Sequence, residues 1–480
     1  MMQREALYQL LKNKYGFDEF RPGQYQVISE LLAGQDVLAV LPTGTGKSLI
    51  YQLVGTVVPG LVIVVSPLIS LMQDQVARLN YQGEKQVAAL TSQLDFGARQ
   101  SVLRHLKQLK FLFISPEMLK QAPVLAAVEQ VPLSLLVIDE AHCISTWGPD
   151  FRPDYLSLGA LKQTLGNPLT LMLTATATAK VRQDILNQLQ VPSAQQVIYS
   201  VNRPNIYLAV EAVANEAAKR QRLQQLVVTV KRPSIVYFSS KKQTELIADW
   251  LRATTALRVA AYHAGLSAED RFKIQQQFMA GDLDVICATS AFGMGINKAD
   301  IRQVIHYHLP NNLADYVQEI GRAGRDGQPA IAVLLYAPGD EQLVRNLNEL
   351  TSASAIEIQA DQQRFTLQQP ATTDLSQVLQ YYWTHGYTVP QVTAQFEQRQ
   401  RAKAADLTQL LTYIQAKTCR RAILMQYFNE TAPVHTATCC QLAGERLPLD
   451  ELGLLTRQTT SRPVTTPWEQ ILAQLFLQNS

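Results

Sequence analysis

The chain has 480 residues, of which 47% are hydrophobic and 17% charged, and its formal net charge is +3 at pH 7. This composition excludes a disordered chain, and a prior of roughly 150 residues per domain predicts about three domains. Five cysteines are too few for a disulfide framework, and no segment has the ~20 consecutive apolar residues of a membrane span. Residues 1–11 lack the apolar core of a signal peptide, so we expect a cytoplasmic protein without a membrane partner.

Two series of short apolar runs, each followed by polar or amphipathic sequence, occupy the first two thirds of the chain. The first series comprises residues 37–40, 61–65, 111–114, 135–138 and 169–173. The second comprises residues 234–238, 284–288, 304–307 and 330–336. Buried strands that alternate with helices are typical of parallel α/β layers. We therefore predict two tandem α/β domains, over residues 1–203 and 204–339, with a connector at residues 202–205.

The sequence changes character after residue 339. Gln-rich, amphipathic sequence that favours helices extends to about Phe428, and no further buried strand is indicated. We predict a helical region over residues 340–443. The remaining residues, 444–480, contain one predicted helix at 468–477 and are too short for a core of their own, so we treat them as a tail.

A glycine-rich loop lies between the first apolar run and a helix that we expect to begin near Leu49. Glycines let backbone N–H groups and the helix N-terminus face a phosphate, while a lysine reaches the terminal phosphates and a hydroxyl ligates magnesium. The candidate nucleotide-binding residues of this loop are Thr43, Gly44, Thr45, Gly46, Lys47 and Ser48. The alternative interpretation is an ordinary glycine-rich turn.

Two carboxylates follow the fourth apolar run, and two arginines lie in the second predicted domain. We predict that Asp139 holds magnesium together with Ser48, and that Glu140 positions and deprotonates the attacking water. Arg322 and Arg325 share one face of a helical turn, where they would meet the negative charge that develops in phosphoryl transfer. The predicted ligands are ATP and Mg²⁺, and hydrolysis would depend on closure of the cleft between the domains. The predicted catalytic residues are Lys47, Asp139, Glu140, Arg322 and Arg325.

The alternative to a catalytic role is, for Asp139 and Glu140, the solvated start of a loop. For Arg322 and Arg325 it is the solvated basic end of a helix. Together, however, the segments resemble the paired RecA-like cores of superfamily 2 helicases, and their details resemble the RecQ family. The resemblance covers about residues 6–440 and is carried further by the segments 15–24, 65–75, 141–153, 173–178 and 288–297. It implies two RecA-like domains and an ATP-dependent DNA helicase that moves 3' to 5' in repair and recombination. The implied protein is a monomer in the cytoplasm, associated with the nucleoid.

The resemblance also implies roles for individual residues. Arg21 and Gln24 belong to a segment similar to the family's adenine-recognition element, and Gln318 would join the nucleotide site. In the aromatic-rich loop, Trp147 and Phe151 offer stacking faces to unpaired bases, although core packing is the alternative. The implied DNA contacts are Ser66, His142, Trp147, Phe151, Arg152, Thr289 and Phe292. Single-stranded and tailed DNA are the expected substrates, and other repair proteins are possible partners.

The helical region departs from the family's pattern at its four-cysteine zinc site. Cys419 begins a matching Cys-Arg-Arg helix, but Ala437 and Ala443 occupy two ligand positions if Cys440 takes the third. Structural zinc requires four tetrahedral ligands, and adjacent cysteines rarely both point at one metal. The donors that could be combined are Cys419, His435, Cys439 and Cys440. On this argument we expect a helical hairpin without zinc.

Three other functions compete with the helicase. The family's winged helix is largely absent after residue 443, which favours a DNA-stimulated translocase that remodels protein–DNA complexes with little unwinding. An RNA helicase stays open because contacts to a phosphate backbone do not test for the 2'-hydroxyl. A nucleic-acid-binding scaffold with a silent ATPase is disfavoured by the intact catalytic set.

Overall fold

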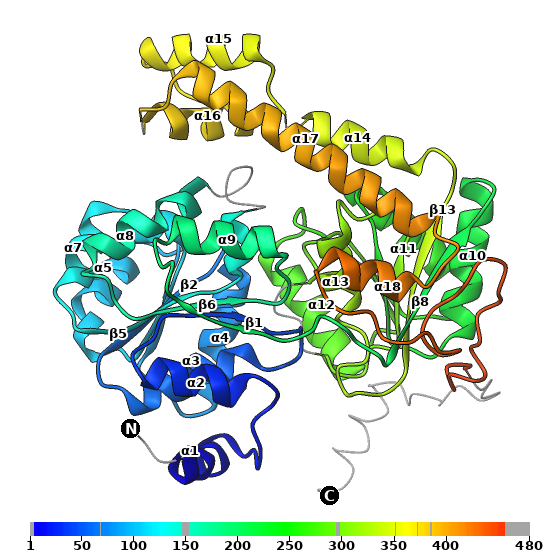
Figure 1. Cartoon of the computed structure of the whole chain (residues 1–480), viewed down its shortest axis with the longest axis horizontal. Coiled ribbons are helices and arrows are strands. Elements are labelled where there is room, and N and C mark those ends of the chain that lie inside the picture. Colours follow the sequence, from blue (N-terminus) through cyan, green and yellow to red (C-terminus); the bar gives the residue numbers. More distant parts are fainter. Residues whose placement is uncertain are drawn as a thin grey trace, which may run out of the picture.

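A computed structural model of the chain describes residues 4–67, 69–145, 153–293, 298–350, 352–371, 373–384 and 386–456. Two α/β lobes lie side by side, and a group of helices extends beyond them (Figure 1). Among the described helices, none combines the length and the apolar character needed to cross a membrane.

The first lobe is built on a sheet of parallel strands in the order β3-β4-β2-β5-β6-β1-β7. Its strands are β1 (Val37–Val40), β2 (Leu61–Val65), β3 (Val87–Leu90), β4 (Phe111–Ile114), β5 (Leu133–Ile138), β6 (Thr170–Thr174) and β7 (Gln195–Ile198). Its helices include α1 (Arg4–Leu10), α2 (Gln24–Leu32), α3 (Lys47–Val57), α4 (Ile69–Tyr81), α5 (Phe96–Arg104), α6 (Pro116–Leu119), α7 (Ala122–Glu129), α8 (Leu158–Thr164) and α9 (Ala179–Gln188). Alternate side chains of β2 enter two different cores, with Ile63 in one and Val64 in the other. Helices therefore cover both faces of this sheet, which explains its continuous apolar strands.

The second lobe repeats this plan with parallel strands in the order β10-β11-β9-β12-β13-β8. Its strands are β8 (Ile206–Ala212), β9 (Ser234–Tyr237), β10 (Val259–Tyr262), β11 (Val285–Ala288), β12 (Gln303–His306) and β13 (Ala330–Tyr336). Its helices include α10 (Glu216–Thr229), α11 (Lys241–Thr254), α12 (Ala268–Ala280) and α13 (Leu313–Ile320). The predicted pair of parallel α/β lobes is confirmed. Every predicted apolar run forms a strand, whereas β3, β7, β8 and β10 are strands that the sequence patterns do not predict.

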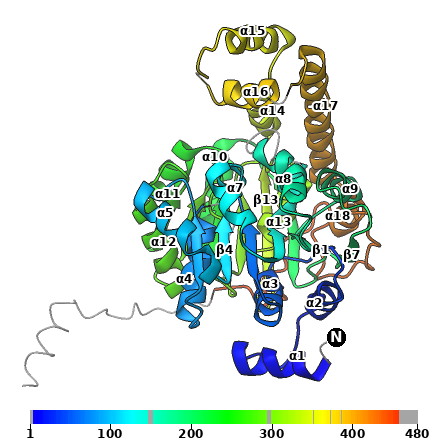
Figure 2. The same ribbon diagram turned by 90° about the vertical axis from the view of Figure 1, so that its left-hand side faces the viewer.

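The predicted helical C-terminal region is also confirmed. Its helices are α14 (Asp340–Leu350), α15 (Ala355–Thr366), α16 (Asp374–Thr384), α17 (Val389–Ile414) and α18 (Arg420–Tyr427). The helices α15 and α16 and the start of α17 share a small separate core that contains Trp383 and Phe396. The far end of α17 brings Leu410 and Tyr413 into the core of the second lobe. Figure 2 shows α17 running from the small core toward the lobes.

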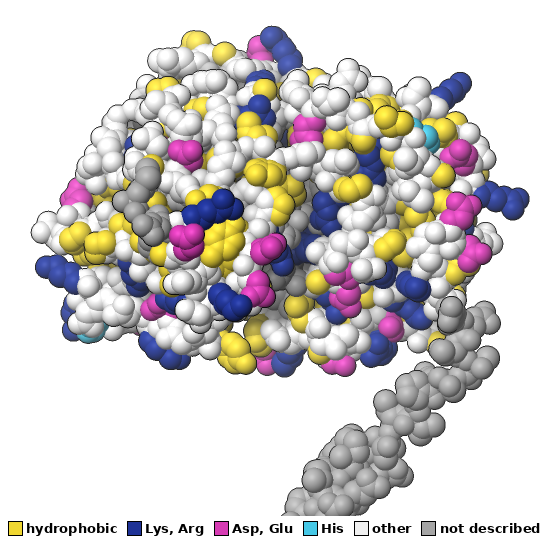
Figure 3. All heavy atoms as spheres, turned by 60° about the horizontal axis from the view of Figure 1, so that its bottom comes forward, with side chains coloured by type: hydrophobic (Ala, Val, Ile, Leu, Met, Phe, Trp, Pro, Cys, Tyr) yellow, Lys and Arg dark blue, Asp and Glu magenta, His cyan; other side chains and the backbone are white. Residues whose placement is uncertain are grey.

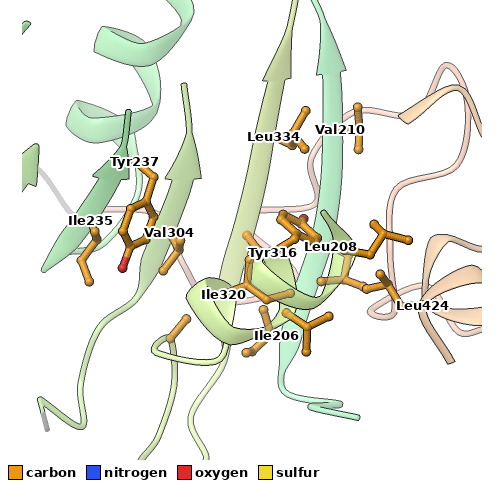
Figure 4. Packing of buried hydrophobic residues seen from close by; sticks show 14 of the residues in the cluster. Ile206, Leu208, Val210, Ile235, Tyr237, Val304, Tyr316, Ile320, Leu334 and Leu424 are labelled. Atoms are coloured by element: carbon orange, nitrogen blue, oxygen red, sulfur yellow. The ribbon is translucent and has the colours of Figure 1, made fainter. Parts of the chain in front are cut away.

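The segment from α18 onward packs against the second lobe. Leu424 of α18 lies beside Leu208 of β8 and Tyr316 of α13 in one core (Figure 4). The following segment pairs with the edge of β8, where Leu208 N donates to Cys439 O at 3.4 Å and Gln441 N donates to Leu208 O at 2.8 Å. Part of the predicted tail therefore packs on the lobe, because Leu454 is also buried in its second core. The predicted helix at 468–477 lies outside the described residues.

Candidate active site

The phosphate loop connects β1 to α3 in the first lobe. Gly44 and Gly46 have φ values of +88° and +74°, a left-handed conformation that other residues rarely adopt. At Gly44 a Cβ atom would also lie 3.2 Å from Cγ of Arg325. Lys47 and Ser48 follow in the first turn of α3, and Lys47 Nζ donates to Leu41 O at 3.2 Å. The loop thus presents backbone N–H groups at a helix N-terminus.

Two side chains from the start of the lobe hold this loop. The Arg21 guanidinium donates to Gly44 O, and Arg21 N donates to Gln24 Oε1 at 2.9 Å. Gln24 Nε2 donates to Thr45 O at 2.8 Å and to Gly46 O at 3.1 Å. Buried Gln24 therefore ties the predicted adenine-recognition segment to the phosphate loop.

Asp139 and Glu140 follow β5 and lie close to Lys47. Burial, and then the neighbouring Glu140, raises the pKa of Asp139 to about 7, while Lys47 opposes this rise. One buried carboxylate oxygen, Glu140 Oε2, has no hydrogen-bond partner within the described parts of the chain. Asp139 Oδ1 accepts from Glu140 N at 3.0 Å, so a buried pair of acids with few donors remains, which fits a site for a cation and water. Asp139 and Ser48 offer the hard oxygen ligands that Mg²⁺ requires, so the residues fit the predicted ion.

Arg325 of the second lobe packs against Gly44 of the phosphate loop, whereas the Arg322 guanidinium donates to Gly293 O within its own lobe. Burial lowers the pKa of Lys47 against the attraction of Glu140 and Asp139, and Arg325 and Arg322 lower it further. The five predicted catalytic residues therefore share one electrostatic environment. Burial, followed by Arg322, lowers the pKa of Arg325 to about 9.

The two lobes also touch directly beside the phosphate loop. Thr43 Oγ1 donates to Gly321 O at 2.7 Å, and a Cβ at Gly321 would lie 2.5 Å from Thr43 Oγ1. A small pocket at this junction is lined by Pro42, Thr43, Ala175, Thr176, Val201, Arg203, Val317 and Gly321. Gln318 is buried in α13, and among the described residues no hydrogen bond joins its side chain to the phosphate loop. Its assignment to the nucleotide site stays a prediction.

His142 connects the carboxylates to β6. Its Nδ1 lies 2.9 Å from Thr174 Oγ1 and 3.4 Å from Glu140 Oε2, and Thr174 Oγ1 donates to Thr176 O at 3.1 Å. Burial lowers the pKa of His142. Since its ring is buried, His142 lies between the carboxylates and β6 rather than on a DNA-facing surface. A coupling role fits this position better than the direct DNA contact that we predicted.

The remaining predicted DNA contacts fall into three groups. Trp147, Phe151 and Arg152 lie outside the described residues. Thr289 is half-buried at the end of β11, and Ser66 is buried at the end of β2. Phe292 requires a correction.

Phe292 is 0% exposed and packs edge-to-face on Tyr262 and Phe278, with ring centroids 4.7 Å and 5.6 Å away. Its side chain belongs to the core of the second lobe, and because it is fully buried it offers no face to a base. The predicted contact between this side chain and DNA is wrong for this structure.

A furrow separates the two lobes on the face drawn in Figure 3, and Lys and Arg side chains are visible inside it. A basic furrow attracts a polyanion through its phosphates, although the net charge of the whole chain is only +3. The local charge of this furrow, rather than the net charge of the chain, is the feature that would act on a polyanion.

A cysteine–histidine cluster, formed by Cys419, His435, Cys439 and Cys440, lies where the helical region meets β8. Its ligand atoms all lie within 4.8 Å of one another. The Sγ atom of Cys419 is 3.7 Å from that of Cys439 and 3.6 Å from that of Cys440, and Cys440 Sγ is 3.7 Å from His435 Nδ1. Sulfurs at ~2.3 Å from a tetrahedral zinc ion are separated by roughly 3.8 Å. The cluster therefore fits zinc.

This geometry overturns our expectation of a hairpin without zinc. The Sγ atoms of Cys439 and Cys440 both approach Cys419 Sγ. The argument that adjacent cysteines do not point at one metal is therefore wrong for this chain. His435 supplies the fourth donor in place of the family's missing cysteines. The signal for this site in the sequence is His435, a few residues before the cysteine pair.

Comparison with known proteins agrees with this arrangement. Family models match three segments: the DEAD/DEAH box helicase at residues 21–185, the helicase conserved C-terminal domain at 218–327 and the RecQ zinc-binding model at 361–442. The probable ATP-dependent DNA helicase RecS of Bacillus subtilis (strain 168) is 43% identical over 462 residues, which cover 93% of each chain. The ATP-dependent DNA helicase RecQ of Haemophilus influenzae is 37% identical over 92% of this chain and 63% of its own length.

The fold is similar to that of solved helicases. The structure of Mycobacterium smegmatis helicase Lhr bound to ssDNA and AMP-PNP aligns with a TM-score of 0.58 and 19% identity, over 88% of this chain and 62% of that one. The DUF1998 helicase MrfA bound to DNA aligns with a TM-score of 0.60 and 19% identity, over 72% and 54%. These likenesses concern the arrangement of the two lobes.

Proposed function

Because the chain belongs to the RecQ family of ATP-dependent DNA helicases, we propose that it uses ATP hydrolysis to move along single-stranded DNA and to separate duplex DNA in the 3' to 5' direction. The observation that carries this proposal is the assembly of one catalytic set from two lobes. Lys47, Asp139 and Glu140 come from the first lobe. From the second lobe Arg325 packs against Gly44 of the phosphate loop, and Arg322 lies on the same turn.

Each residue then has a role in hydrolysis. The N–H groups of the phosphate loop and Lys47 would hold the phosphates of ATP. Asp139 and Ser48 would hold Mg²⁺, which when bound would offset negative charge on the phosphates. Glu140 orients and deprotonates the attacking water. Arg322 and Arg325 stabilise the charge that develops on the transferred phosphoryl group.

The same contacts convert hydrolysis into movement. Charge on the γ-phosphate attracts the arginines and draws the lobes together, with Thr43 bonded to Gly321 O at 2.7 Å across the junction. Loss of that phosphate removes the attraction and lets the lobes separate. Alternation between the two states moves the lobes along a bound strand. His142, between Glu140 and Thr174, relays the state of the carboxylates to the loops that follow β6.

A decisive experiment compares fluorescent DNA duplexes that carry a 3' or a 5' single-stranded tail, and an RNA duplex with a 3' tail, in ATP and Mg²⁺. Separation of the 3'-tailed DNA alone supports the proposal. Separation of RNA instead favours an RNA helicase, and DNA-stimulated hydrolysis without separation favours a translocase.

The control for this experiment is Lys47→Ala. We expect no strand separation and no ATP turnover from the variant, while its affinity for single-stranded DNA stays within about twofold of the parent. Turnover that survives in Lys47→Ala would show that the phosphate site is misassigned.

We also propose that the cysteine–histidine cluster holds one structural zinc ion per chain. Zinc would fix the segment after α18 against β8, because Cys419 precedes α18 and the other three ligands lie in that segment. Zinc content measured by plasma spectrometry should be close to one per chain in the parent and lower in His435→Ala. Cys287→Ala, which alters a buried cysteine far from the cluster, should keep the parental content. A parent protein without zinc would contradict this assignment.

The wider setting is likewise a proposal drawn from the family. We infer that the protein works as a monomer on chromosomal DNA in the cytoplasm, in repair and recombination, with other repair proteins as partners. Light scattering of the protein with a tailed duplex would test the monomer, since a mass above one chain per duplex contradicts it.

A further inference from the structure

The linker between the lobes holds the turn that carries both catalytic arginines. The Arg203 guanidinium donates from Nη1 to Gly321 O at 3.0 Å, and from Nη2 to Ala323 O at 3.0 Å and Gly324 O at 2.7 Å. These carbonyls follow the C-terminus of α13, where backbone acceptors have no partner within the helix. One planar guanidinium thus caps three carbonyls of the turn in a fixed orientation.

A second linker side chain supports the same turn. Asn205 Nδ2 donates to Gly324 O at 2.8 Å and to Gln328 O at 2.9 Å. Gly324 has φ +54°, and a Cβ there would lie 2.5 Å from Asn205 Nδ2. The turn is therefore held tightly from the linker side, while Arg325 on the same turn packs against Gly44 of the phosphate loop.

The linker itself is held by the C-terminal helical region. Arg421 of α18 is 4% exposed, and its guanidinium donates to Asn202 Oδ1 at 2.8 Å and to Arg203 O at 3.0 Å. The same group donates to Cys439 Sγ at 3.3 Å and to Cys439 O at 3.0 Å. Glu430, just after α18, accepts from Val201 N at 3.0 Å. A continuous path of hydrogen bonds leads from the cysteine–histidine cluster through Arg421 and Arg203 to the arginine turn.

We propose that Arg203 is a positioning residue for Arg322 and Arg325, and that Arg421 holds the linker so that Arg203 can do this. The inference rests on the proposed ATP-driven function. It makes the placement of the catalytic arginines depend on the helical region, although none of the described residues of that region is assigned to the ATP site.

Another role for Arg203 would be to add a third positive charge near the phosphates. Both terminal nitrogens of Arg203 are already bonded to backbone carbonyls, which favours positioning. The two roles predict different behaviour for Arg203→Lys. Lysine keeps the charge but has one compact ammonium, which cannot reproduce the fork over three carbonyls. If Arg203 contributes only its charge, Arg203→Lys should therefore keep ATP hydrolysis. If Arg203 positions the turn, the lysine variant should lose it.

The experiment measures DNA-stimulated ATP hydrolysis of the full chain in the parent, Arg203→Lys and Arg203→Ala, with Arg252→Ala as the matched control. Arg252 is an exposed arginine of the second lobe that pairs with Asp249. A misplaced catalytic group costs on the order of 100-fold in rate, so we expect kcat to fall by roughly 10- to 100-fold in both Arg203 variants. The KM for ATP and the affinity for a fluorescent ADP should stay within about twofold, because Arg203 is not expected to contact nucleotide.

Arg421→Lys extends the test to the helical region. We expect a smaller fall in kcat, and the double variant Arg203→Lys with Arg421→Lys should lose little more than Arg203→Lys alone, because both side chains act on the same turn. Circular dichroism and thermal unfolding identify any variant that fails to fold, and Arg203→Lys decides if Arg203→Ala does not fold.

The outcomes separate this inference from the proposed function. A parent without DNA-stimulated hydrolysis refutes the function. If the parent is active and Arg203→Lys has the same kcat as the parent, the positioning role is overturned. It is also overturned if the variant's KM for ATP rises by the same factor as its kcat falls. Strictly additive losses in the double variant overturn the link through Arg421.

Discussion

Asp315, in the first turn of α13, is predicted to make the stability of the second lobe depend on pH. Burial, followed by the neighbouring Glu319, raises the pKa of Asp315 from 3.8 to about 7, and Asp406 adds to the rise. Asn311 Nδ2 opposes it through a hydrogen bond of 3.0 Å to Asp315 Oδ2. The fold therefore favours the protonated carboxyl over the ionised one.

The sign of the effect follows from linkage. A carboxyl with a raised folded pKa contributes stability that is fully present below its unfolded pKa and is lost as the pH rises through the folded value. For Asp315 the window runs from 3.8 to about 7. At ~1.36 kcal/mol per pH unit the ionised form is penalised by up to roughly 4 kcal/mol, and solvent at this half-buried position reduces that to about 2 kcal/mol.

Asp315→Asn removes the charge and keeps an oxygen that can accept from Asn311. We expect the variant to be more stable than the parent by about 2 kcal/mol at about pH 8.5, and to differ from it by less than about 0.5 kcal/mol near pH 4. Urea unfolding at both pH values measures the difference, with the exposed Asp450→Asn as control. A variant that is destabilised equally at both pH values would refute the reasoning.

Three further predictions concern packing and DNA. Leu424→Ala removes a core side chain that is 2% exposed and should cost about 2–5 kcal/mol by urea unfolding; a cost below about 1 kcal/mol would mean that α18 is not anchored there. Asp361→Ala leaves the buried donors of Trp383 and Ser376 without an acceptor, so hydrogen exchange of α15 and α16 should accelerate while ATP hydrolysis is kept. Loss of hydrolysis would contradict a separate small core. Trp147→Ala should lower the stimulation of hydrolysis by single-stranded DNA more than it lowers basal hydrolysis. Equal loss of both would indicate that Trp147 has a packing role instead.

The strands that sequence reasoning found and missed differ in their place in the sheets. Every missed strand, β3, β7, β8 and β10, lies at an edge. An edge strand has one neighbour instead of two and needs less apolar sequence, as the exposed glutamines of β7 illustrate. The interior strands were predictable because burial on both faces demands an unbroken apolar run.

The ATP site was predictable for a similar reason, since each of its groups follows a strand or lies in a recognisable turn. The role of Arg203 was missed because a polar linker residue has no distinctive local pattern, and its partners lie more than a hundred residues away. The burial of Phe292 and the convergence of His435 with the three cysteines also depend on tertiary contacts. A motif predicts which side chains are available, whereas packing decides which way they point.

The segment that ends at the cysteine pair also covers β8, the outermost strand of the second sheet. Cys439 and Gln441 pair with Leu208, and Val210 N donates to Gln441 Oε1 at 3.1 Å. If the proposed zinc ion were removed and the segment came away, the apolar edge Ile206–Ala212 would present unpaired N–H and C=O groups to solvent. Such an edge is a template for a strand from another molecule. Chelation would then make the protein self-associate, so the metal would protect solubility as well as the arrangement of the motor.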